Sequence, residues 1–78
     1  MILNNIRRKK LREACSLLEQ ASALIQKARD EEEDSMNNLP ENLQESVKYE
    51  QMEDAVENLD EALELIESIE DYINVAME

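Results

Sequence analysis

The sequence lacks residue types on which whole classes of function depend: it has no glycine, no histidine, no phenylalanine and no tryptophan. A phosphate-binding loop of the Walker or Rossmann type needs glycine, because the backbone must approach the phosphates without an intervening Cβ. Zinc sites and Ser/His/Asp or Cys/His catalytic sets need histidine or several thiols, and Cys15 is the only cysteine. We therefore predict a protein that is not an enzyme and has no cofactor, metal site or small-molecule substrate.

Basic residues are also scarce, since 8 Lys and Arg stand against 20 Asp and Glu, which gives a net charge of −12. The imbalance lies in residues 41–78, where Lys48 is the only basic residue. Such a surface repels DNA, RNA and anionic lipid, so nucleic acid is a disfavoured partner. No apolar run is long enough to span a bilayer, and the first residues lack the order of a signal peptide. We expect a cytoplasmic protein with no membrane partner.

Strong helix formers dominate the chain, and their apolar members recur at helical spacing. In the first half, the heptad a and d positions and the neighbouring e positions form one wide stripe, which predicts a helix over about 3–35. The a and d positions are Ala14, Leu17, Ala21, Leu24 and Ala28, and the e positions are Leu11, Leu18 and Ile25.

The second half repeats this pattern and predicts a helix over about 41–77. Its stripe consists of Met52, Leu59, Ile66 and Ile73 at a, Ala55, Ala62, Ile69 and Ala76 at d, and Val56, Leu63 and Met77 at e. A turn over 36–40 separates the helices, with Asn38 or Leu39 before Pro40 as the N-cap of the second. Leu39, Leu43 and Val47 depart from the Met52 register, so we expect a kink near residue 46 or a separate short helix.

The two stripes predict an all-α fold, an antiparallel helical hairpin that resembles a coiled coil. Folding back at the turn pairs residues whose numbers sum to about 76, so that Ala21 faces Ala55 and Leu3 faces Ile73. Seventy-eight residues form a single domain, and a hairpin of this size buries little surface by itself. With disulfides and zinc excluded, oligomerisation is the remaining means of stabilisation.

The e positions of both helices lie on the same side of such a hairpin and would leave an apolar strip exposed. We predict that this strip is the dimer or partner interface and that a homodimer forms a four-helix bundle. The strip comprises Leu11, Leu18, Ile25, Val56, Leu63 and Met77. A different helical protein could use the same surface. Leu65 and Tyr72 form a second, smaller apolar patch, which is either partly buried or a partner contact.

Two charged runs admit a functional or a structural interpretation. The basic run at residues 7–12 could bind nucleic acid, but we expect it to pair with Glu64, Glu67, Glu70 and Asp71 of the second helix. The acidic run at residues 30–34 could gather a divalent cation, but the EF-hand spacing is absent. We interpret it as a solvated helix end.

The segment Asn38-Leu39-Pro40-Glu41-Asn42-Leu43-Gln44-Glu45-Ser46, followed by Met52-Glu53-Asp54-Ala55, resembles small acidic helical-hairpin proteins of Gram-positive bacteria and their phages and mobile elements. The resemblance covers the C-terminal half of the chain. It implies a bacterial or phage origin and no particular activity.

The sequence thus favours a structural or interaction protein, a self-associating hairpin with an acidic surface. The alternative is a nucleic-acid-related accessory protein of a phage or mobile element. Such a protein would act as an acidic DNA mimic, or would contact DNA through the basic run at residues 7–12.

Overall fold

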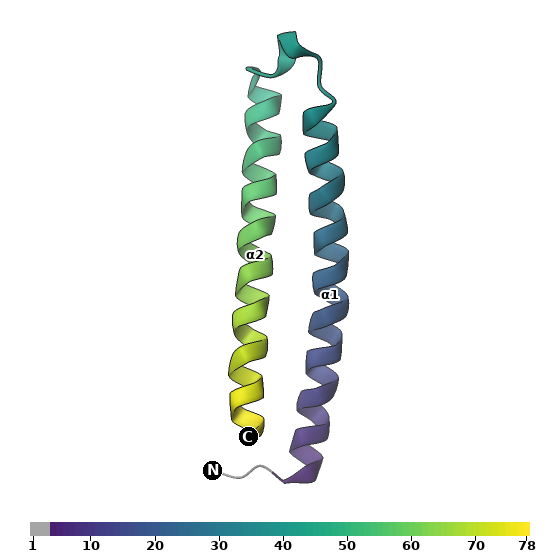
Figure 1. Cartoon of the computed structure of the whole chain (residues 1–78), viewed down its shortest axis with the longest axis vertical. Helices are drawn as coiled ribbons and strands as arrows, with labels where there is room; N and C mark the ends of the chain where they lie inside the picture. Colours follow the sequence, from purple (N-terminus) through teal and green to yellow (C-terminus); the bar gives the residue numbers. More distant parts are fainter. Residues whose placement is uncertain (1–3) are drawn as a thin grey trace.

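The chain folds into two long antiparallel helices joined by a compact connection, as seen in the computed structural model, which describes residues 4–78 (Figure 1). Helix α1 spans Asn5–Asn37, the 3₁₀ turn η1 spans Glu41–Leu43, and helix α2 spans Val47–Met77. Helices are the only regular secondary structure of the described residues, which include no strand. The molecule is a rod of 59 × 17 × 12 Å. The expected contact between Leu3 and Ile73 lies outside the described residues.

Helix α1 begins at a polar cap and ends without any left-handed residue. The Asn4 side chain accepts a hydrogen bond from the backbone N–H of Arg7 at 2.9 Å, which satisfies one free N–H of the first turn. At the other end, the Asn38 N–H donates to the Asp34 carbonyl at 3.0 Å. No residue in 4–78 has positive φ. A chain without glycine can therefore make this connection, because no step of it needs the left-handed region.

The connection between the helices spans residues 38–46, whereas the sequence predicted a turn over 36–40. Pro40 adopts φ −55° and ψ 147°, and its carbonyl accepts the N–H of Leu43 at 2.8 Å to form η1. Helix α2 starts only after Ser46, whose Oγ accepts the N–H of Tyr49 at 3.2 Å. Ser46 is thus the N-cap of α2, and the prediction of Asn38 or Leu39 was wrong. Asn38 instead ends α1.

We expect Ser46→Ala to lower the free energy of unfolding by about 1 kcal/mol, because the Tyr49 N–H loses its acceptor. Urea denaturation followed by circular dichroism measures this change. Ser16→Ala is the matched control, since Ser16 is exposed in the interior of α1 and should change stability little. Equal stability of the wild type and the Ser46 variant would contradict the assignment of Ser46 as the cap.

The two helices pack along a seam in which half-buried residues recur at alternating steps of three and four, as in a coiled coil. In α1 the seam comprises Leu11, Cys15, Leu18, Ser22, Ile25, Arg29, Glu32 and Met36. In α2 it comprises Met52, Val56, Leu59, Leu63, Ile66, Glu70, Ile73 and Met77. Val56, with 6% of its surface exposed, is the only buried residue among those described. The hairpin alone therefore has a very small core.

The predicted alignment of the helices was wrong by about ten residues. Arg29 contacts Asp60, and the Arg8 guanidinium donates to the Met77 carbonyl. The residue numbers of these pairs sum to 89 and 85, compared with the predicted 76. The physical cause is the longer connection, which moves the point of reversal from about residue 38 to about residue 42. As a result, Ala21 does not lie level with Ala55.

Candidate interaction surface

The residues predicted as the dimer interface lie in the seam between α1 and α2. Val56 is buried, and the other members, Leu11, Leu18, Ile25, Leu63 and Met77, are half-buried. The expectation that this strip stays exposed after the hairpin closes was therefore wrong. The apolar stripe of α1 is wide, and the helix is rotated so that its e positions, rather than its a and d positions, point toward α2.

This rotation leaves a different set of large apolar side chains in solvent. Leu17 and Leu24 of α1 and Leu65, Ile69 and Tyr72 of α2 have exposed fractions between 46% and 78%. Leu65 and Tyr72 belong to the second apolar patch that the sequence indicated. Leu17 and Leu24 had been assigned to the contact between the helices, and their exposure is a finding of the structure.

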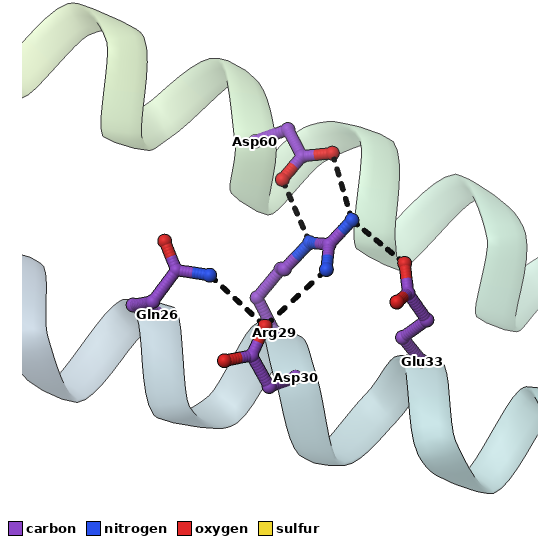
Figure 2. A network of polar contacts seen from close by, with 5 residues as sticks. All are labelled: Gln26, Arg29, Asp30, Glu33 and Asp60. Carbon is purple, nitrogen blue, oxygen red and sulfur yellow. Dashed lines mark hydrogen bonds and ion pairs between the residues drawn. The ribbon is translucent and has the colours of Figure 1, made fainter.

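A polar network marks one flank of the seam (Figure 2). The Arg29 guanidinium contacts Asp60 of α2 with Nε–Oδ1 at 2.8 Å, and it contacts Glu33 and Asp30 of α1 at 2.7 and 3.2 Å. Gln26 donates to Asp30 at 2.9 Å. The Arg29 side chain is only 20% exposed, whereas its carboxylate partners are 38–57% exposed. Nothing in the sequence distinguished Arg29 from the other charged residues.

The network raises the pKa of the Arg29 guanidinium above its ordinary value. The hydrogen bond with Asp60 is the main cause, partial desolvation opposes it, and Asp30 and Glu33 add to it. A raised folded-state pKa contributes stability that is complete below the unfolded-state value and is lost only as the pH rises through the folded-state value. Titration of Arg29 itself therefore leaves stability unchanged at neutral and acidic pH.

The position of this network shows where the exposed apolar residues lie around the hairpin. Residues seven apart share one column along a helix in a coiled coil. The Asp60 column of α2 is polar, whereas the column on the opposite flank of the seam is apolar. The first column contains Glu53, Asp60, Glu67 and Asn74, and the second contains Ala55, Ala62, Ile69 and Ala76.

Helix α1 shows the same division. Two apolar columns lie on the flank away from Glu33. The first, next to the seam, contains Ala14, Ala21 and Ala28, and the second, farther from the seam, contains Leu17 and Leu24. The apolar columns of both helices lie opposite the network and therefore on one face of the hairpin. We call this the apolar face. It comprises Ala14, Leu17, Ala21, Leu24 and Ala28 of α1 and Ala55, Ala62, Leu65, Ile69, Tyr72 and Ala76 of α2.

The surface area of the chain is large for its mass. A compact monomer of 9.1 kDa exposes about 4,900 Å², whereas the hairpin exposes 6162 Å². The excess is roughly 1,300 Å² for each chain. Two chains that each removed this excess would bury roughly 2,500 Å², which is the size of an obligate dimer interface.

Four of the five basic residues in the run at residues 7–12 do not form the predicted ion pairs in the described part of the chain. Arg7, Lys9, Lys10 and Arg12 are exposed and have no ion pair with any other part of the chain that the structure describes. Arg8 is half-buried, and its bond to the Met77 carbonyl closes the open end of the hairpin. The acidic run at residues 30–34 instead supplies Asp30 and Glu33 to the Arg29 network.

Comparison of the chain with known protein families, curated proteins and solved structures gave no match. Neither helix, over residues 4–78, is both long and apolar enough to cross a membrane. The functional argument therefore starts from the geometry of the apolar face.

Proposed function

We propose that this protein is a non-enzymatic interaction protein that acts as a self-associating helical hairpin. Two copies pack by their apolar faces into a four-helix bundle and present an acidic surface to solvent. The observation that carries the proposal is the apolar face itself, which extends over both helices and whose large side chains remain exposed when the hairpin is closed. Soluble monomers seldom expose so extensive an apolar surface.

The apolar pattern of each helix fits a bundle better than it fits an isolated hairpin. In a four-helix bundle, each helix directs its core positions between its two neighbours. For α1 these positions combine one column of the seam with the adjacent column of the apolar face, namely Leu11, Leu18 and Ile25 with Ala14, Ala21 and Ala28. For α2 they are Met52, Ala55, Leu59, Ala62, Ile66, Ile69, Ile73 and Ala76. Within residues 11–28 and 52–76, every one of these positions is apolar.

Sedimentation equilibrium of the wild-type protein at micromolar concentration tests the proposal. We expect a mass of two chains that falls toward one chain on dilution. A well-folded monomer at all concentrations would exclude self-association, and the apolar face would then belong to a different helical partner.

The nucleic-acid alternative has one observation in its favour, which is the exposure of Arg7, Lys9, Lys10 and Arg12. Against it stands the net charge of −12, which repels phosphate backbones from most of the surface. Retention on a heparin column at physiological salt would support DNA contact through this run. An acidic mimic of DNA would pass through the column.

A further inference from the structure

The two ends of the hairpin carry very different charge. The tip, where α1 meets the connection, is strongly acidic, and its basic residues are Arg29 and Lys48. Its acidic residues are Asp30, Glu31, Glu32, Glu33, Asp34, Glu41, Glu45, Glu50, Glu53 and Asp54. The open end carries the basic residues at positions 7–12, four of them exposed and without an ion pair in the described part of the chain. This polarity along the rod distinguishes the orientations that a dimer can adopt.

Two hairpins that pack by their apolar faces can be related by a two-fold axis in either of two directions. An axis parallel to the helices places the two acidic tips together and packs α1 against α2 of the other copy. An axis perpendicular to the helices places each tip beside the basic open end of the other copy and packs α1 against α1. The first arrangement concentrates like charge within a few ångströms, where salt screens it incompletely.

The apolar face of α1 has a pattern that suits the second arrangement. Lys10, Leu17, Leu24 and Glu31 occupy one exposed column, each seven residues from the next. If a second copy of α1 packs antiparallel to the first about a two-fold axis between residues 20 and 21, Leu17 of each copy lies opposite Leu24 of the other. Lys10 of each copy then lies opposite Glu31 of the other. The alanine column beside it is centred on Ala21, and its small side chains allow close approach of two helices.

Helix α2 supplies an independent check on the position of the axis. Its exposed column of Asn58, Leu65 and Tyr72 is centred on Leu65. The contacts of Arg29 with Asp60 and of Arg8 with Met77 place residues 20–21 of α1 level with about residues 65–68 of α2. One perpendicular axis therefore passes close to the centre of both columns.

We infer that the apolar face is occupied by a second copy of this chain in antiparallel orientation. In this dimer Leu17 contacts Leu24 of the other copy, and Lys10 pairs with Glu31 of the other copy. The inference rests on the proposed function, because it specifies the geometry of the same self-association. The exposed basic run then serves to set the orientation of the dimer.

Disulfide crosslinking between single-cysteine variants distinguishes the two orientations. Cys15 is replaced by serine, and Ala14→Cys and Ala28→Cys are prepared separately, mixed under reducing conditions and then oxidised. In the antiparallel dimer the two positions meet across the axis, so mixed disulfides should outnumber disulfides between identical chains at least about fivefold, compared with the equal amounts expected from random pairing. A prominent disulfide between Ala21→Cys and Ala62→Cys copies would instead show the parallel dimer and overturn the inference.

Charge reversal tests the proposed ion pair directly. Lys10→Glu should raise the dimer dissociation constant roughly tenfold, because it places like charges together at two symmetric sites. Lys10→Glu combined with Glu31→Lys should restore it. Lys9→Glu is the matched control, since it changes the net charge equally but lies away from the apolar face. Equal effects of the Lys9 and Lys10 variants, with the dimer retained, would overturn the orientation alone, whereas a monomeric wild type would refute the proposed function itself.

Discussion

Leu24→Glu is expected to convert the proposed dimer into folded monomers, with a rise of the dissociation constant of roughly 100-fold or more. Leu24 has 70% of its surface exposed in the hairpin, so glutamate is tolerated there as long as the chain is alone. In the dimer the carboxylate would be buried at two symmetric positions without a partner, and this costs much more than the lost leucine contacts. Sedimentation equilibrium measures the mass, and circular dichroism confirms that the helices remain.

Ala23→Glu is the matched control for this experiment. Ala23 is also exposed, but it lies on the column of Lys9, Ser16 and Asp30, away from the apolar face. The control should therefore remain dimeric, although it carries the same added charge one residue earlier. Dissociation by both variants would point to a general effect of charge and would argue against a specific apolar interface.

Leu63→Glu is expected to abolish the hairpin itself. Leu63 is half-buried in the seam on the same helix as Val56, so the carboxylate would be desolvated against α1. Because a hairpin with one buried residue has little stability to lose, we expect most of the helical circular dichroism signal at 25 °C to disappear.

Leu65→Glu provides the comparison, two residues along the same helix. Leu65 is exposed on the apolar face, so this variant should keep its helices and lose only the dimer. The original sequence-based assignment, with Leu63 exposed in the dimer interface, predicts a helical monomer for Leu63→Glu instead. Retention of full helicity by the Leu63 variant would therefore contradict the seam seen in the structure.

Two helices in an antiparallel hairpin could be predicted from the sequence, because the apolar stripes of residues 11–28 and 52–77 are long and regular. Which edge of each stripe faces the other helix could not be predicted. Leu11, Leu18 and Ile25 are as apolar as Leu17 and Leu24, and periodicity defines the width of a stripe without showing which edge faces the other helix. In the proposed four-helix bundle both edges would be covered, which would account for the absence of polar residues on either.

The alignment of α1 against α2 was predicted wrongly because the start of α2 was misplaced. It depends on where α2 begins, and the Asn38-Leu39-Pro40-Glu41 segment has the features of a helix start. In the structure Asn38 ends α1, only the short 3₁₀ turn Glu41–Leu43 follows Pro40, and Ser46 caps α2 six residues after Pro40. The separate short helix before residue 46 was one of the two outcomes expected from the displaced stripe of Leu39, Leu43 and Val47. The capping role of Ser46 and the Arg29–Asp60 pair could not be selected in advance, since serines and charged residues occur throughout the chain. The sequence therefore placed the candidate interface on residues that lie in the seam between the helices.

The near absence of a buried core in a single hairpin has a consequence for the protein in a cell. If packing of a second copy adds to the small buried area of the hairpin, association stabilises the fold, and the melting temperature rises with protein concentration. At low abundance the single hairpins would open to proteases more often than the chains that are paired above the dissociation constant. The amount of protein would then vary more steeply than its rate of synthesis, without any dedicated regulator.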